Sequence, residues 1–178
     1  MGDDVAAVIE ELKLVRPVLV GWSYGGFIMC DYLARYGARG ISGLNFVGAA
    51  VRLTPTHEML GAGFLENASG MASSDIGERI AAVRHFVRAC AAQPLPQHVL
   101  ETFLCFNISV PPEVKVAMAE RCLDFSGLLS KLEIPVLVTQ GLADDIVLPA
   151  MAEHIANITP HAEASFYEHV GHIPFTEA

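Results

Sequence analysis

The chain has 178 residues, with 11 Lys and Arg against 20 Asp and Glu, and therefore a net charge of −9. Apolar residues make up 52% of the chain and charged residues only 17%. This excludes intrinsic disorder, which requires low hydrophobicity together with high net charge. The length is typical of one domain with a sizeable core. An acidic chain without basic runs is a poor match for nucleic acid. No apolar run is long enough to span a bilayer, so we expect no membrane partner.

The cysteines and the first residues bear on the cellular setting. The four cysteines, none of them in a C-x-x-C pair, are Cys30, Cys90, Cys105 and Cys122. Each has apolar neighbours in the sequence, which predicts free thiols that act as small hydrophobic side chains. The chain starts with Met1-Gly2-Asp3-Asp4, which is too acidic for the start of a signal peptide. We therefore expect a reduced, cytoplasmic protein.

Apolar spacing predicts four elements in the first part of the chain. They are helices over residues 5–14 and 27–36, and strands over residues 18–20 and 41–47. The first strand, Val18-Leu19-Val20, is a continuous apolar run. Such a run is typical of a strand buried on both faces of a parallel sheet.

Residues 53–132 have a different pattern, in which Pro, Gly and Ser separate short helical stretches. Asp75 and Glu78 have the spacing of a helix-capping box, and apolar residues follow them at helical intervals. We predict that this segment is a helical cap insertion without a sheet. The remaining residues, 1–52 and 133–178, would then form one core domain.

The last part of the chain returns to alternating strands and helices. The predicted elements are strands over residues 135–139 and 164–167, a helix over residues 149–157 and a closing loop over residues 168–174. Strands that alternate with helices indicate an α/β fold with a parallel sheet.

The most specific motif is Gly21-Trp22-Ser23-Tyr24-Gly25-Gly26, which contains G-x-S-x-G. A strand is predicted directly before it and a helix directly after it, as a nucleophile elbow requires. We expect Gly21 and Gly25 to be glycines because a sharp turn leaves no room for a Cβ atom there. We expect Gly26 to let the helix lie close to the strand.

A serine hydroxyl needs a base, usually His, and the base needs an orienting carboxylate. Two later loops supply these groups. Gly141-Leu142-Ala143-Asp144-Asp145 follows the third strand, and Gly171-His172-Ile173-Pro174 follows the fourth. The order Ser, Asp, His is the order in which α/β-hydrolases carry these residues.

With these three motifs, the chain resembles an α/β-hydrolase of the Ser-nucleophile type, a family that includes esterases, cofactor-free haloperoxidases and carbon–carbon bond hydrolases. The resemblance implies that Ser23 is the nucleophile, His172 the general base and Asp144 the residue that orients it. It also implies that the backbone N–H of Tyr24 is one oxyanion donor. No metal and no organic cofactor are needed.

Two of these assignments have competitors. Asp145 lies next to Asp144, and a shift of the loop by one residue would exchange them. We favour Asp144 because its spacing from Gly141 fits the family. His169 competes with His172, but the Gly before and the Pro after His172 favour the latter. His169-x-x-His172 lacks a third patterned ligand, so we expect no metal there.

The resemblance leaves several functions open. We predict a hydrolase that acts on a small carboxylic ester through an acyl-enzyme, with a small molecule as its partner and an oligomeric state that the sequence does not indicate. A haloperoxidase-like or carbon–carbon bond hydrolase is the alternative within enzymes. Family members have several strands before the elbow strand and a helix after the His loop, so we also expect a chain truncated at both ends. Residues 18–20 would then form an open edge, and an inert fragment is a further alternative.

Overall fold

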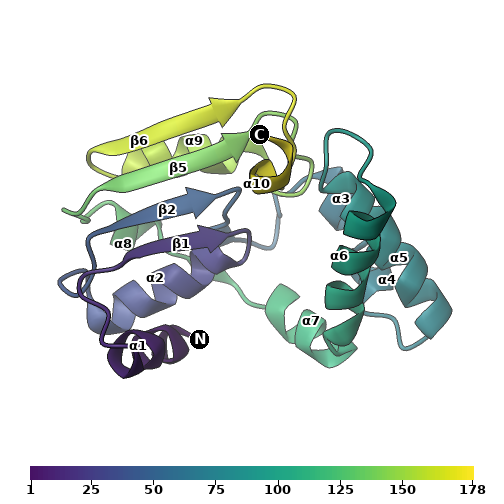
Figure 1. Cartoon of the computed structure of the whole chain (residues 1–178), viewed down its shortest axis with the longest axis horizontal. Coiled ribbons are helices and arrows are strands. Elements are labelled where there is room, and N and C mark those ends of the chain that lie inside the picture. Colours follow the sequence, from purple (N-terminus) through teal and green to yellow (C-terminus); the bar gives the residue numbers. More distant parts are fainter.

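The computed structural model describes all residues from 1 to 178. Its main feature is a parallel sheet of four strands in the order β1-β2-β5-β6 (Figure 1). The strands are β1 (Val18–Trp22), β2 (Gly43–Val47), β5 (Val136–Gly141) and β6 (Ala162–Tyr167). All three pairings are parallel. The predicted α/β class is therefore confirmed, and all four strands end at the same edge of the sheet.

Five helices accompany the sheet. They are α1 (Gly2–Glu11), α2 (Gly25–Tyr36), α8 (Ser126–Leu129), α9 (Pro149–Ile158) and α10 (Pro174–Glu177). Helices α2, α9 and α10 pack on its strands, while α1 packs on α2 and α8 on α9. Helix α2 begins two residues before the predicted helix because Gly25 and Gly26 already form its first turn. The predicted closing loop also ends in a helix, since α10 begins at Pro174, whose fixed φ suits a first helical position.

The sheet is covered on one face only. In β1, Val18 and Val20 are exposed while Leu19 between them is partly buried. In β5, Leu137 is exposed between the buried Val136 and Val138. The expectation that residues 18–20 are buried on both faces is therefore wrong, because helices pack against one side of these strands. The expected open edge is confirmed, since β1 pairs with β2 alone.

The core lies between this sheet and its helices. It is one cluster of 23 buried apolar residues, and its largest fully buried side chains include Phe46 of β2 and Met151 and Ile155 of α9. The packed core holds the strands in place. The loops at the carboxyl ends of the strands therefore carry their polar side chains on a rigid scaffold.

The segment between β2 and β5 is mostly helical and extends away from the sheet (Figure 1). Before α8, its helices are α3 (Ala62–Leu65), α4 (Ala68–Met71), α5 (Ile76–Ala89), α6 (Gln97–Ser109) and α7 (Pro112–Ala119). The prediction that this segment contains no sheet is wrong, because β3 (Arg52–Leu53) and β4 (Leu123–Asp124) form a small antiparallel sheet. Two-residue strands are too short to produce an alternating pattern. The division into a core and a cap insertion stays a prediction.

Helix α5 begins at the predicted capping residue. The Asp75 carboxylate accepts the backbone N–H of Glu78 at 2.8 Å. The Glu78 side chain does not return to Asp75 and instead accepts the Ser73 hydroxyl at 2.8 Å. The cap is therefore shared by three residues, and Ser73 links its two halves by also accepting the Asp75 N–H.

The cysteines divide into two classes. All four are free, but Cys30 and Cys90 are buried whereas Cys105 and Cys122 are exposed. Burial raises the pKa of Cys30 to about 12 and also raises the pKa of Cys90 above its ordinary value. The expectation of four hydrophobic thiols is thus wrong for Cys105 and Cys122, which lie on outward-facing surfaces despite apolar sequence neighbours. No helix is long and apolar enough to cross a membrane.

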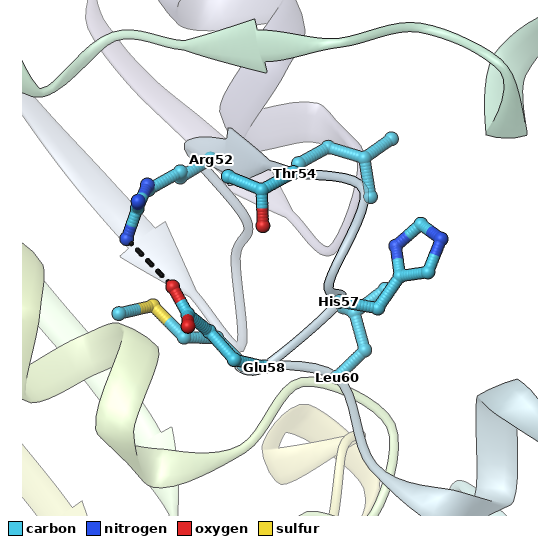
Figure 2. Close-up of a pocket in the computed structure, with 7 residues that line it drawn as sticks. Arg52, Thr54, His57, Glu58 and Leu60 are labelled. Carbon is cyan, nitrogen blue, oxygen red and sulfur yellow. Dashed lines mark hydrogen bonds and ion pairs between the residues drawn. The ribbon is translucent and has the colours of Figure 1, made fainter.

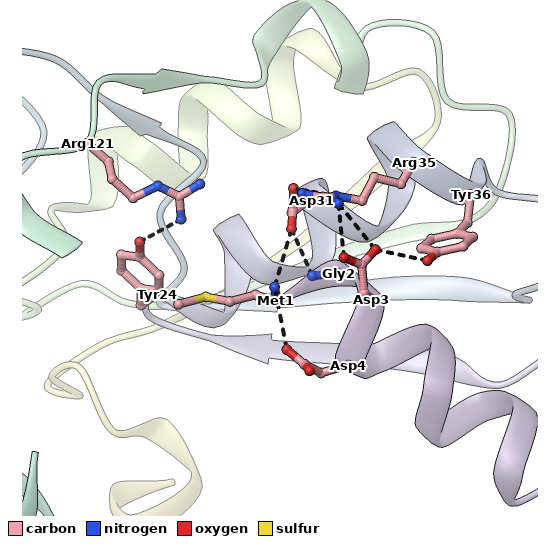
Figure 3. Close-up of polar contacts among 9 residues, drawn as sticks. All are labelled: Met1, Gly2, Asp3, Asp4, Tyr24, Asp31, Arg35, Tyr36 and Arg121. Atoms are coloured by element: carbon pink, nitrogen blue, oxygen red, sulfur yellow. Dashed lines mark hydrogen bonds and ion pairs between the residues drawn. The ribbon is translucent and has the colours of Figure 1, made fainter. Parts of the chain in front are cut away.

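Helix α1 is held on α2 by a polar network around Asp31 (Figure 3). The Asp31 carboxylate accepts the backbone N–H of Gly2 at 2.8 Å and the Arg35 guanidinium at 3.1 Å. Arg35 also donates to Asp3. The Gly2 N–H, helped by Arg35 and opposed by burial, lowers the pKa of Asp31.

This network predicts a pH-dependent contribution to stability. Because folding lowers the pKa of Asp31, the contribution is present above the unfolded pKa of about 3.9 and is lost as the pH falls through the folded value. We expect D31N to lower the free energy of unfolding by about 1 kcal/mol at pH 7, with a smaller difference below pH ~4. Urea unfolding at several pH values measures this. E11Q is the control, because Glu11 at the end of α1 is exposed and its side chain takes part in none of the hydrogen bonds or ion pairs of the structure. An equal effect of both variants at every pH would contradict the account.

Candidate active site

Ser23 lies in the turn between the end of β1 and the start of α2. Its φ is +54°, a left-handed conformation that side chains other than glycine rarely adopt. Three backbone hydrogen bonds hold the turn: the Ser23 N–H donates to Val47 O at 3.1 Å, and Ser23 O accepts the N–H groups of Gly26 at 3.1 Å and Ala50 at 3.0 Å. Local strain of this kind persists only where surrounding structure enforces it, and it is concentrated at functional positions.

The glycines around Ser23 have different roles. A Cβ atom at Gly21 would lie 2.7 Å from Gly25 O, so this position requires glycine. A Cβ atom at Gly26 would overlap Ala50 O, which belongs to the loop after β2 rather than to β1. At Gly25 a Cβ atom would meet nothing within 4 Å. The expectation of steric need at Gly25 is therefore wrong, because its Cα hydrogens face open space.

The Ser23 hydroxyl is joined to His172 and Asp144 by two hydrogen bonds. His172 Nε2 lies 2.9 Å from Ser23 Oγ, and His172 Nδ1 lies 2.8 Å from Asp144 Oδ2. His172 is 1% exposed and Asp144 3% exposed. Ser23 follows β1, Asp144 follows β5 and His172 follows β6. The carboxyl ends of these strands lie at one edge of the sheet. In this arrangement an imidazole can take the serine proton while a carboxylate orients the ring.

Asp144 receives four hydrogen bonds in a buried environment. Oδ1 accepts the backbone N–H groups of Ile146 at 2.8 Å and Val147 at 3.0 Å. Oδ2 accepts the Gln140 amide at 2.9 Å in addition to its contact with His172. Burial of a carboxylate is costly unless its lone pairs are satisfied. These donors therefore fix both the position and the orientation of the carboxylate.

The two competing residues lie elsewhere. Asp145 is exposed and accepts the backbone N–H of Gly63 at 3.0 Å, so it links its loop to α3. His169 is exposed, and its backbone has a φ of +60°. Neither side chain contacts Ser23. No group of three His, Cys, Asp or Glu side chains is arranged to hold a metal ion.

Tyr24, the residue after Ser23, is the N-cap of α2. Its backbone N–H donates to no group in the structure, and it lies at the positive end of the helix dipole. Its hydroxyl accepts the Arg121 guanidinium at 3.0 Å (Figure 3). A free N–H next to Ser23 is suited to stabilise a negative charge that develops there.

Sequence reasoning missed several residues that hold this site together. The Trp22 indole N–H donates to His172 O at 2.7 Å, and its ring lies 5.3 Å from the His172 ring. Gly48 has a φ of +49°, and a Cβ atom there would lie 3.2 Å from His172 Nδ1. Gln140 donates to Asp144. Gly48 and Gln140 belong to no short motif. Trp22 lies inside the G-x-S-x-G segment, but at a position where the motif specifies no residue type.

A small pocket lies away from Ser23. It has a volume of about 10 Å³ and is lined by residues that include Arg52, His57 and Glu58 (Figure 2). A cavity of this size holds about one water molecule. A larger cleft, of about 420 Å³, opens beside the residues that precede the strands, at the end of the sheet opposite Ser23.

Comparison with solved structures gives close matches over nearly the whole chain. The esterase RhEst1 from Rhodococcus sp. ECU1013 matches with a TM-score of 0.91 and 30% identity, over 98% of this chain and 65% of that one. A bromoperoxidase from Bacillus anthracis matches with a TM-score of 0.83 over 99% of this chain and 68% of that one. Its identity is 20%, so this similarity shows the fold alone.

Sequence comparison adds a family and a further relative. A proline iminopeptidase from Lactobacillus delbrueckii subsp. lactis is 25% identical over 188 residues, which cover 96% of this chain and 64% of that protein. The chain thus spans less than two thirds of the length of the esterase and of the iminopeptidase. The model of the Alpha/beta hydrolase family matches residues 2–178. Because that match covers almost every residue described above, the chain belongs to the Alpha/beta hydrolase family.

Proposed function

We propose that this chain carries the catalytic residues of a serine hydrolase that cleaves small carboxylic esters through an acyl-enzyme. The observation that supports it most directly is the hydrogen-bonded series Ser23–His172–Asp144 at the carboxyl edge of the sheet. The strained backbone of Ser23 is a second, independent support. The similarity to an esterase at 30% identity agrees with the proposed substrate class.

The proposed acylation follows from the positions of these atoms. Ser23 Oγ attacks the ester carbonyl carbon and transfers its proton to His172 Nε2. The carbonyl oxygen becomes an oxyanion, which accepts the free N–H of Tyr24 at the start of α2. Asp144 stabilises the imidazolium through Nδ1. When the tetrahedral intermediate collapses, the alcohol leaves with the proton from His172, and the acyl group stays on Ser23.

The proposed deacylation repeats these steps with water. His172 takes a proton from a water molecule, which attacks the acyl carbonyl carbon. The second tetrahedral intermediate collapses, Ser23 Oγ recovers its proton from His172, and the carboxylic acid is released. The same residues act in both halves, so one site suffices for hydrolysis and no redox step is involved.

A panel of p-nitrophenyl esters of increasing acyl length tests the reaction class. We expect a burst of p-nitrophenolate equal to the enzyme concentration, and preference for short acyl chains. S23A lowers kcat by about 10³-fold or more, because the nucleophile is lost. The same protein with acetate, bromide and hydrogen peroxide tests for haloperoxidase-like chemistry. Turnover of peroxide without turnover of any ester, or S23A at the wild-type ester rate, would contradict the proposal.

The two adjacent aspartates provide a matched pair of variants. D144N leaves a neutral amide beside His172 and is expected to lower kcat by about 10⁴-fold, because the ring loses its orienting charge. D145N keeps an oxygen that can accept the Gly63 N–H, so we expect kcat within about twofold of wild type. Steady-state kinetics on both variants, with melting temperatures as a control, measures this. A larger loss in D145N than in D144N would assign the acid to Asp145.

A further inference from the structure

Glu177 of α10 binds two separate segments with its carboxylate. Oε2 accepts the backbone N–H of Gly171 at 2.7 Å. Oε1 accepts the backbone N–H groups of Ala92 at 2.8 Å and Gln93 at 3.2 Å. No Lys, Arg or His lies within 4 Å of this carboxylate. Its negative charge is therefore met by backbone N–H groups alone, and such charge-assisted bonds are stronger than neutral ones.

The two segments that Glu177 joins also contact each other directly. The His172 N–H donates to Cys90 O at 2.7 Å. A Cβ atom at Gly171 would lie 2.7 Å from Cys90 O and 2.8 Å from Ala92 N. The loop that carries His172 thus lies backbone to backbone against the chain that follows α5, with no side chain between them.

The backbone of His172 is held from three directions. Glu177 binds the N–H of the preceding residue, Cys90 accepts the N–H of His172, and Trp22 donates to its carbonyl. Only the side-chain torsions of His172 remain free of these contacts. The ring must span Ser23 and Asp144 with bonds of 2.9 and 2.8 Å. A displacement of about 1 Å would break one of these bonds.

We propose that Glu177 is a positioning residue, which holds the His172 loop against the end of α5 so that the imidazole bridges Ser23 and Asp144. This inference rests on the proposed function, because it gives His172 the role of the base. It also makes α5, a helix remote from the sheet, part of the support of that base. A carboxylate is required because both of its oxygens are used, one on each segment.

Substitutions at Glu177 separate this role from general stability. In E177Q one oxygen remains, so only one segment keeps its acceptor and an amide N–H faces the other. E177D keeps the charge but is one methylene shorter, and E177A removes every contact. E163Q is the matched control, because Glu163 on β6 is exposed and has no partner among the hydrogen bonds of the structure.

Proton NMR on the full chain gives a readout that does not depend on turnover. The Nδ1 proton of His172, bonded to Asp144, is expected in the low-field region. We expect this signal to shift or broaden in E177Q and E177A, and the Gly171 amide to exchange with solvent at least 10-fold faster, with E163Q unchanged. Where turnover is measurable, kcat falls at least 10-fold in E177Q with KM within twofold, and E177D recovers part of the loss.

The outcomes separate this inference from the proposed function. An unchanged His172 signal and unchanged Gly171 exchange in folded E177Q would overturn the role of Glu177, whatever the activity. If E177Q and E177A do not fold, E177D is compared with wild type. A changed His172 signal and faster Gly171 exchange in E177D would support the role of Glu177, and unchanged signals would overturn it. Changed signals in E177Q, combined with a wild-type protein that hydrolyses no ester, would support the positioning role and refute the hydrolase.

Discussion

The buried Asp144 carboxylate is the group on which the rest of the site depends. A carboxylate removed from water must be compensated by hydrogen bonds. Here two backbone N–H groups, the Gln140 amide and the His172 ring supply them. The loop after β5 therefore folds around Asp144. The loop after β6 contacts the Asp144 carboxylate through the His172 ring. Ser23 then meets the far nitrogen of the same ring.

The parallel sheet places Ser23, Asp144 and His172 at one edge. The residues of the site were predictable from the sequence to different degrees. The apolar runs of β1 and β5 and the motifs beside Ser23, Asp144 and His172 are local. The sequence alone therefore indicates the parallel sheet and the edge at which these three residues lie. Gln140, Trp22 and Glu177 were not predictable. Trp22 and Glu177 form contacts that join distant segments, and Gln140 donates to Asp144 four residues away; no short motif records any of these contacts. The exposure of Val18 and Val20 was missed for a similar reason, since an apolar run does not say which face the helices cover.

The region between β2 and β5 contributes to the site more than its sequence suggested. Its pattern predicted helices and a capping residue at Asp75, and both are present. Its link to the site is formed by backbone groups: Cys90 O and the N–H groups of Ala92 and Gln93. Backbone contacts leave no trace in composition or spacing. The position of α5 relative to the His172 loop could therefore be read only from the structure.

The proposed chemistry requires that Ser23 be an activated nucleophile. Intact-mass analysis after treatment with a fluorophosphonate tests it most directly, because the reagent reacts with an activated serine and needs no knowledge of the substrate. We expect one adduct on the wild-type chain and none on S23A, with the modified residue identified as Ser23 after digestion. A folded wild-type chain without an adduct, or an adduct of equal yield on S23A, would contradict it.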